Sequence, residues 1–321
     1  MRTLRFVGEL REALQPARRS GRTVGLVATM GALHEGHLSL IAAARAQCDV
    51  VVVSLFVNPA QFDEPADLDR YPRQEDHDSL LAERAGADLL FAPSREEVYP
   101  AGFSTSVEVR GLTDRLEGAV RGAAHFRGVT TVVTKLLNMV APDVAYFGQK
   151  DAQQLAVIRR LVVDLNLAVR VVACPTVREL DGLAMSSRNA HLSAHERARA
   201  VALHRALAAA ETAAARGERS GEELVRVARE TMAPLDVRPE YLALVSPETL
   251  EPVTHLDQPA LLAIAARVGD TRLIDNVILH PTAQPTVRVA HAAVAQSTPQ
   301  PAVRSNSPHP TPREAPVTCS A

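Results

Sequence analysis

The sequence predicts an α/β protein with an open parallel sheet covered by helices on both faces, followed by a smaller α+β domain. Two observations support this. Between residues 24 and 172, short apolar runs rich in β-branched residues alternate with helix-length amphipathic segments, the pattern of βαβ units. After residue 176, Ala- and Arg-rich helical stretches are followed by three strand-like runs, an order typical of α+β architecture.

The first domain is expected over residues 1–175. Its predicted strands are residues 24–28, 50–57, 87–91, 144–147 and 169–172, and its predicted helices are residues 37–47, 74–85, 129–139 and 152–165. This alternation describes a Rossmann-like, doubly wound sheet, which binds ligands at the carboxyl ends of its strands. Functional motifs are therefore expected directly after the strands.

The smaller domain is expected over residues 176–281. Ser193 with Glu196, and Ser220 with Glu223, have the spacing of capping boxes and precede helical stretches. Strand-like runs follow at residues 241–245, 261–265 and 273–279.

The end of the chain has a different composition. Residues 281–321 hold 8 of the 21 prolines and four charged residues. Such a segment buries too little apolar surface to offset its ordering entropy, so residues 282–321 are predicted to be a disordered tail.

Charge and cysteine content exclude several classes of function. With 35 Lys and Arg against 37 Asp and Glu, the chain has no long-range field to recruit nucleic acid or an anionic membrane. Three widely separated cysteines indicate neither a disulfide framework nor a zinc site. No apolar run resembles a signal peptide or reaches the ~18 residues of a membrane span. We expect a cytoplasmic protein.

The first candidate motif is Thr-Met-Gly-Ala-Leu-His-Glu-Gly-His at residues 29–37, after the first predicted strand. His34 and His37 can donate to a phosphate held at a helix N-terminus, and Gly31 and Gly36 allow close backbone approach. A zinc site is less favoured, because zincin histidines are four residues apart on one helix, whereas these are three apart. A polar loop is the ordinary alternative.

The second motif, Phe-Val-Asn-Pro-Ala-Gln-Phe at residues 56–62, follows the second strand. Asn58 and Gln61 are neutral donors and acceptors suited to hydroxyl and carboxylate groups. Taken alone, the segment is better interpreted as a Pro-containing turn.

The third motif, Tyr-Phe-Gly-Gln-Lys-Asp-Ala-Gln-Gln at residues 146–154, joins a strand to a helix. Lys150 supplies a compact positive charge for phosphate, and Asp151 supplies an acceptor. Only two lysines occur in the chain, which strengthens this interpretation. The other, Lys135, is expected to lie along a packed helix with its ammonium at the surface.

The fourth motif, Asp-Gly-Leu-Ala-Met-Ser-Ser-Arg-Asn at residues 181–189, lies between the two predicted domains. Ser186, Ser187 and Arg188 would clamp phosphate oxygens, although a domain linker has a similar composition. Residues 117–128, with Arg121 and His125, are either further substrate contacts or a surface loop.

These motifs supply cations and hydrogen-bond donors but no activated nucleophile. The sequence has no Gly-x-Ser-x-Gly elbow, no Walker motif and no Gly-x-Gly-x-x-Gly after the first strand. Positioning and charge stabilisation around a nucleotide remain, with the substrate's own oxygen attacking the α-phosphorus. The predicted chemistry is nucleotidyl transfer.

Over residues 1–281 the chain resembles the pantothenate synthetase (pantoate–beta-alanine ligase) family of the His-x-Gly-His nucleotidylyltransferase superfamily. The four motifs carry the resemblance, together with Leu-Ile-Asp-Asn at residues 273–276. It implies that (R)-pantoate attacks ATP to form pantoyl adenylate and pyrophosphate, and that beta-alanine then displaces AMP to give pantothenate. It also implies Mg²⁺, a homodimer formed through the first domain, and closure of the smaller domain over the site.

The resemblance assigns site residues by position. His34, His37, Lys150 and Arg188 would be catalytic, with His37 as proton donor. Gln61, Gln154 and Asn58 would bind pantoate, and Gln61 would also meet beta-alanine. The ATP-binding residues would be Met30, Gly31, Ala32, Leu33, His34, Glu35, Gly36, His37, Gly148, Gln149, Lys150, Asp151, Val177, Met185, Ser186, Ser187 and Arg188.

Two departures from the family pattern stand out. Ala28 occupies the position of a usual proline, and residues 121–128 are one residue longer than the usual Arg-Pro-Gly-His-Phe form, so Arg121 is assigned no role. The alternatives are another adenylate-forming or nucleotidyl-transfer enzyme acting on a different small acid, and a regulatory nucleotide-binding protein. The regulatory protein would be expected to lack a motif His or Lys, and none is missing.

Overall fold

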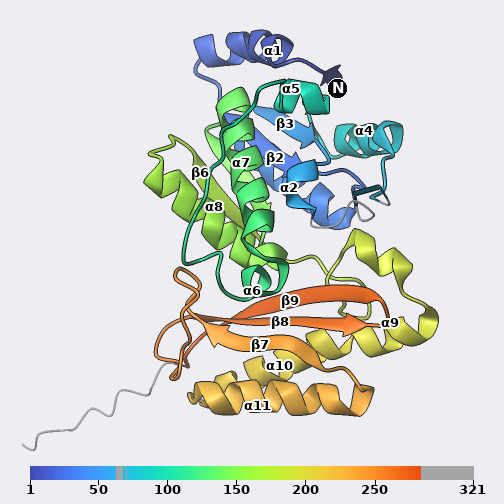
Figure 1. Cartoon of the computed structure of the whole chain (residues 1–321), viewed down its shortest axis with the longest axis vertical. Coiled ribbons are helices and arrows are strands. Elements are labelled where there is room, and N and C mark those ends of the chain that lie inside the picture. Colours follow the sequence, from blue (N-terminus) through green and yellow to red (C-terminus); the bar gives the residue numbers. More distant parts are fainter. Residues whose placement is uncertain (63–67, 70, 283–321) are drawn as a thin grey trace, which may run out of the picture. The chain divides into compact units, whose positions relative to one another are not determined.

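Six parallel strands form the first sheet, in the order β1-β4-β3-β2-β5-β6 (Figure 1). They are β1 (Arg2–Leu4), β2 (Val24–Thr29), β3 (Val50–Leu55), β4 (Leu89–Phe91), β5 (Val144–Gly148) and β6 (Arg170–Cys174). The computed structural model describes residues 1–62, 68–69 and 71–282. Because β2 lies between β3 and β5, the strand order reverses at β2 and β5, which is where open α/β sheets bind ligands.

Helices cover both faces of this sheet. On one face Leu26, Val52 and Phe147 pack with α1 (Val7–Arg19), α7 (Ala123–Val140) and α8 (Ala152–Asp164). On the other face Val27 and Val53 pack with α2 (Glu35–Gln47) and α4 (Glu75–Arg84). Successive strand residues point to opposite faces, so the continuous apolar runs of the sequence are those of strands buried on both sides.

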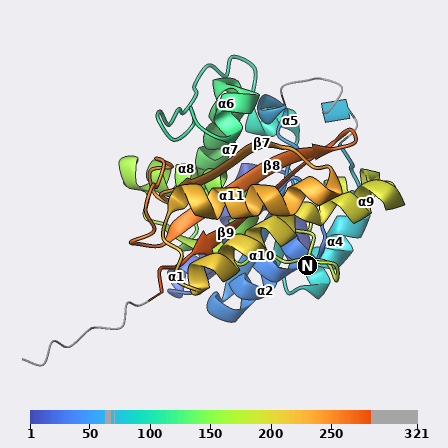
Figure 2. The same ribbon diagram turned by 90° about the horizontal axis from the view of Figure 1, so that it is seen from below.

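The second sheet is antiparallel and has the order β7-β8-β9. Its strands are β7 (Pro239–Val245), β8 (Ala260–Val268) and β9 (Thr271–Leu279). Helices α10 (Ala202–Ala215) and α11 (Gly221–Met232) lie against one face of this sheet, as Figures 1 and 2 show, and α9 (Ala194–Ala200) precedes them. The predicted fold class is confirmed.

Several elements differ from the prediction. β1 and α1 were not expected, because the first strand has only three residues and α1 contains Pro16. Two short helices, α5 (Arg95–Val98) and α6 (Glu117–Arg121), were also missed, and α7 begins at Ala123 rather than 129. Helices this short have too few turns to show an apolar periodicity.

The two predicted helix caps differ in detail. Ser193 and Glu196 form the reciprocal capping box of α9. Ser220 caps α11 by accepting from the Glu223 backbone N–H, but its own N–H donates to Glu218 instead. The second prediction was therefore correct for the cap and wrong for the reciprocal bond.

Met1–Thr282 forms one compact unit. Its division at residue 175 into two domains stays a prediction, and the predicted tail from residue 283 onward lies outside the described residues. No helix among the described residues is long and apolar enough to span a membrane.

Candidate active site

A cavity of about 300 Å³ lies where β2, β3 and β5 end. Segments far apart in the sequence line it, including the loop after β2, the 3₁₀ turns η1 (Pro59–Gln61) and η2 (Gln149–Asp151), and the turn η3 (Ser187–His191). Residues of β8 and β9 complete the lining. Because the strands are parallel, their carboxyl ends meet at one edge of the sheet and bring these segments together.

The two histidines sit in the first turn of α2. His34 is the N-cap, and its Nδ1 accepts from the Gly36 N–H at 3.1 Å; Nδ1 of His37 accepts from the His34 N–H at 3.4 Å. A neutral imidazole whose Nδ1 accepts carries its proton on Nε2. Both rings, with centroids 4.2 Å apart, are therefore Nε2–H donors.

Burial and neighbouring charge keep this pair neutral. Burial, followed by His34 and Lys150, lowers the pKa of His37 from 6.5 to about 3. Burial, followed by Lys150, also lowers the pKa of His34. In the free protein the pair thus offers neutral hydrogen-bond donors, and the positive charge nearby comes from Lys150.

Asp78 of α4 holds the loop that leads to these histidines. Its buried carboxylate accepts from the backbone N–H groups of Ala32 and Leu33 at 2.9 and 2.8 Å. Gly31 has φ of +87°, and a Cβ there would lie 3.0 Å from the Asp78 carboxylate. The loop therefore turns these two amides toward Asp78 of α4 and needs glycine at residue 31 to do so.

We call His34, His37, Lys150 and Arg188 the basic end of the cavity. The Lys150 ammonium and the Arg188 guanidinium have no ion pair or side-chain hydrogen bond among the described residues. Ser186 caps η3 by accepting from the Arg188 backbone N–H. Two cations that line one cavity and have no counter-ion within the described part of the chain favour an anionic ligand.

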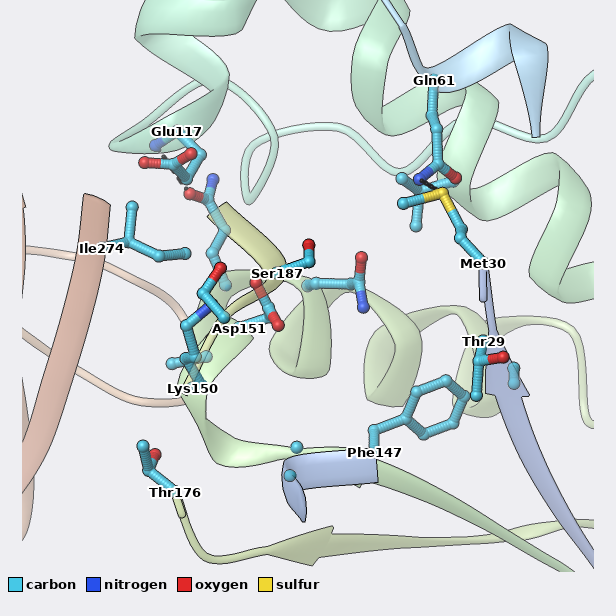
Figure 3. A pocket seen from close by; sticks show the side chains of 18 of the residues that line it. Thr29, Met30, Gln61, Glu117, Phe147, Lys150, Asp151, Thr176, Ser187 and Ile274 are labelled. Carbon is cyan, nitrogen blue, oxygen red and sulfur yellow. Dashed lines mark hydrogen bonds between the residues drawn. The ribbon is translucent and has the colours of Figure 1, made fainter. Parts of the chain in front are cut away.

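We call Asn58 and Gln61 the amide end. Figure 3 shows Gln61 beside Met30 on one side of the pocket, with Lys150 and Asp151 on the other. Asn58 is 1% exposed, and its Nδ2 donates at 3.1 Å both to the Gly128 carbonyl and to Gln61 Oε1. The Gln61 Nε2 group is thereby left to face Met30 and the cavity.

Tyr99 completes the amide end from outside the cavity lining. Its hydroxyl donates to Asn58 Oδ1 at 2.8 Å, and the same oxygen accepts from the Ala60 N–H. Burial raises the Tyr99 pKa to about 12, so this hydroxyl keeps its proton. Since Gly128 C=O only accepts and Ala60 N–H only donates, the Asn58 amide has one orientation.

The segment around α6 also reaches the cavity. Arg121 Nη1 lies 3.2 Å from His125 Nε2, and His125 Nδ1 lies 2.8 Å from the Gln61 carbonyl oxygen. Both residues line the cavity. Despite the longer segment, Arg121 and His125 are therefore part of the cavity wall.

The structure brings most of the predicted residues to the cavity. The lining includes Met30, His34, Gly36, His37, Asn58, Gln61, Gly148, Lys150, Asp151, Gln154, Val177, Met185, Ser186, Ser187 and Arg188. Five predicted residues, all within the described part of the chain, are outside the lining: Gly31, Ala32, Leu33, Glu35 and Gln149. Leu33 packs in the core, and Glu35 is exposed on α2.

Several residues around the cavity were given no specific role from the sequence, although Glu117 lies in the segment 117–128 named as possible substrate contacts. Glu117 of α6 accepts from Arg272 of β9 at 2.7 and 2.8 Å and from the Tyr241 hydroxyl at 2.7 Å. Asp78 and Tyr99 were also missed. The only sequence signal for Asp78 was an acidic residue in a helix-length segment, and nothing marked Tyr99.

No group of three or more His, Cys, Asp or Glu side chains is placed to hold a metal ion among residues 1–62, 68–69 and 71–282. Asp151 is a carboxylate in the lining beside Lys150. It offers one hard oxygen ligand, and a cation there would need most of its ligands from elsewhere.

The pantoate-beta-alanine ligase family model matches residues 2–278. The chain belongs to this family. It is 54% identical to pantothenate synthetase 1 of Bradyrhizobium diazoefficiens over 280 residues, covering 87% of this chain and 98% of that protein. It is 55% identical to pantothenate synthetase of Acidobacterium capsulatum over 262 residues, covering 81% and 87%. The protein is thus an enzyme, a pantoate–beta-alanine ligase of pantothenate biosynthesis.

Solved structures of two members of this family match the fold of this chain. Pantothenate synthetase of Thermus thermophilus matches with a TM-score of 0.83 and 49% identity, covering 88% of this chain and 100% of that one. The pantoate-beta-alanine ligase of Francisella tularensis, solved with beta-gamma ATP and beta-alanine, matches with a TM-score of 0.70 and 31% identity, covering 87% and 97%. The six-stranded sheet and smaller antiparallel sheet are those of this family.

Proposed function

We propose that the enzyme joins (R)-pantoate to beta-alanine in two steps at this cavity, with ATP as a substrate. A carboxylate oxygen of pantoate attacks the α-phosphorus of ATP, and pyrophosphate leaves. The amine of beta-alanine then attacks the acyl carbon of pantoyl adenylate, loses a proton and expels AMP. The observation that carries this proposal is one cavity that has, at one end, neutral donors and cations without an ion pair to any described residue, and at the other end amides fixed by hydrogen bonds.

At the basic end, positioning and hydrogen bonding would do the catalytic work. His34 and His37 donate through Nε2–H to oxygens on the phosphorus that is attacked, because both Nδ1 atoms are occupied by backbone N–H groups. Lys150 and Arg188 compensate the charge that passes to pyrophosphate. Since burial keeps the pKa of His37 low, its role as proton donor begins from a neutral ring.

The other predicted nucleotide contacts are part of the same proposal. Met30, Gly36, Gly148, Asp151, Val177, Met185, Ser186 and Ser187 line the same cavity. The predicted ATP-binding residues outside the lining would support the nucleotide site without lining the cavity; they are Gly31, Ala32, Leu33, Glu35 and Gln149.

At the amide end, Gln61 and Gln154 would hold pantoate, with Gln61 also meeting beta-alanine. The Nε2–H group of Gln61 suits an acceptor such as a carboxylate or hydroxyl oxygen. Direct binding of pantoate by Asn58 stays a prediction. The Francisella tularensis ligase, solved with beta-gamma ATP and beta-alanine, supports the same substrates here.

Mg²⁺ fits this cavity as a partner of ATP. Asp151 supplies one carboxylate next to Lys150, and Mg²⁺ typically takes one or two carboxylates together with substrate phosphates and water. When bound, Mg²⁺ neutralises phosphate charge. Lys150 and Arg188 orient the phosphates from the protein side.

Two further properties follow from the family resemblance. We propose that the protein is a homodimer and works in the cytoplasm, on small-molecule substrates and without nucleic acid or membrane. Light scattering after gel filtration at micromolar concentration should give twice the chain mass; a monomer mass would contradict the homodimer.

The reaction is tested by omitting each substrate in turn. With ATP and pantoate alone, the enzyme should release pyrophosphate, and AMP should follow only when beta-alanine is added. Replacing pantoate with other small hydroxy acids tests the alternative acceptor. Absence of pyrophosphate release with (R)-pantoate, together with release for another acid, would overturn the proposal.

A further inference from the structure

Strand β9 of the second sheet touches both segments that carry the cations of the basic end. Leu273 and Leu279 of β9 pack in the core with α10 and α11, whereas Ile278 packs toward the first sheet. Consecutive strand residues point to opposite sides. Asp275 and Asn276 therefore reach in two different directions.

Asn276 holds the turn that carries Lys150. Its Nδ2 donates to the carbonyl oxygens of Gln149 and Lys150 at 3.0 and 2.8 Å, and its Oδ1 accepts from Gln149 Nε2 at 3.4 Å. Asn276 is 5% exposed. A buried amide that satisfies two adjacent carbonyls fixes the backbone of the turn, and so the starting point of the lysine side chain.

Asp275 holds the segment that leads to Arg188. Its carboxylate accepts from both terminal nitrogens of Arg178 at 2.6 and 3.0 Å, and Arg178 also donates to the Gly182 carbonyl. Arg178 pairs with Ala184, and the Met185 N–H donates to Val177 O. This closes the base of the loop just before Ser186, Ser187 and Arg188.

We propose that Asp275 and Asn276 are positioning residues that set the separation of the two cationic arms, Lys150 and Arg188, on the phosphates of ATP. The inference rests on the nucleotide binding proposed above. It assigns a role to Asp275 and Asn276 within residues 273–276, a segment that the sequence singled out without a function. Neither residue needs to touch the nucleotide, because each acts on the backbone that precedes a cation. Figure 3 shows the neighbouring Ile274 beside Asp151 and Lys150.

The test compares binding of ATP and of adenosine by calorimetry, which requires no turnover. Asn276→Ala should weaken ATP binding about fivefold, roughly the loss of one net hydrogen bond, and leave adenosine binding unchanged. In a Lys150→Ala background, Asn276→Ala should weaken ATP binding less than twofold, because the lysine side chain that Asn276 positions is gone. Asp275→Asn should likewise weaken ATP binding and leave adenosine binding unchanged, and its effect on ATP binding should fall below twofold in an Arg188→Met background.

Ile278→Val on the same strand is the matched control and should leave both ligands' binding unchanged. If Asn276→Ala does not fold, Asn276→Ser, which keeps one donor, should show an intermediate loss specific to ATP. Equal losses for ATP and adenosine, or an undiminished loss in the Lys150→Ala background, would overturn the inference. Wild-type ATP binding without pyrophosphate release would instead count against the proposed function alone.

Discussion

At the basic end of the cavity the cations have no partner among the residues that the structure describes, whereas at the amide end the polar atoms are hydrogen-bonded to other residues. Lys150 and Arg188 project from turns in which the backbone C=O of Lys150 and the backbone N–H of Arg188 are bonded to other residues, while the charged groups themselves have no partner among the described residues. Asn58 uses both its amide nitrogen and its oxygen on protein groups and occupies Gln61 Oε1, and with Met30 accepting one N–H of Gln61 a single N–H of that amide is left to face the cavity. The first end is thus built to meet charge, and the second to fix the direction of one hydrogen bond.

The largest effect is expected at the basic end. Lys150→Ala should lower the rate of pyrophosphate release at least about 100-fold, or ~2.7 kcal/mol, as for loss of one preorganised electrostatic contact. The melting temperature should hardly change, because the ammonium has no protein partner among the described residues. Steady-state pyrophosphate release and calorimetric melting measure the two quantities.

Lys135→Met is the matched control, since it removes the chain's other lysine. That ammonium lies 4.6 Å from the Phe103 ring centroid, on α7 and outside the cavity lining. Its loss should change the rate less than about twofold. If Lys150→Ala releases pyrophosphate as fast as the wild type, Lys150 has no catalytic role, and the basic end does not act by meeting the charge of the substrate.

The neutral histidines predict a pH dependence of stability. His37 has a pKa of about 3 in the folded protein against 6.5 as its ordinary value, so between these pH values the unfolded chain binds the proton and the folded chain does not. Stability therefore falls as pH decreases below 6.5. From pH 7 to pH 5 the loss due to His37 is about 2 kcal/mol of unfolding free energy.

Urea unfolding at pH 7 and pH 5 measures this loss, and His37→Gln should reduce it by about that amount. His77→Gln, which removes one imidazole from an exposed position of α4, is the matched control. If the wild type and His37→Gln lose the same stability between the two pH values, His37 is not held neutral by its site.

The four motifs could be found from sequence because their chemistry is local. Three of them join a strand end to side chains of a chemistry suited to a ligand, as Lys150 follows β5 and His34 follows β2, and the fourth lies in the segment after β6. The parallel sheet then brings them together. The scarcity of lysine made Lys150 stand out further.

The supporting residues could not be found in this way. Asp78, Tyr99 and Asn276 act on groups 46, 41 and 126 residues away in the sequence. Each binds a loop backbone or another side chain, so its role exists only once the chain is folded. A buried acid or amide outside a ligand motif looks, in sequence, like any polar residue of a helix or strand.

The smallest effect is expected at the amide end. Tyr99→Phe removes one hydroxyl donor to Asn58 and keeps the ring against Phe56 and Phe103. The KM for pantoate should rise about three- to tenfold, the range of one net hydrogen bond, while the KM for ATP stays unchanged. Initial rates at varied pantoate and varied ATP measure the two constants.

Phe103→Leu disturbs the packing of the same ring but leaves the hydroxyl, so it should not change the KM for pantoate. If Tyr99 acts through Asn58, its replacement in an Asn58→Ala background should have almost no further effect, because the acceptor is gone. Additive losses, or equal increases in both KM values, would mean that Tyr99 only stabilises the fold. The amide end would then owe its orientation to Gly128 and Ala60 alone, since these backbone groups already allow Asn58 a single orientation.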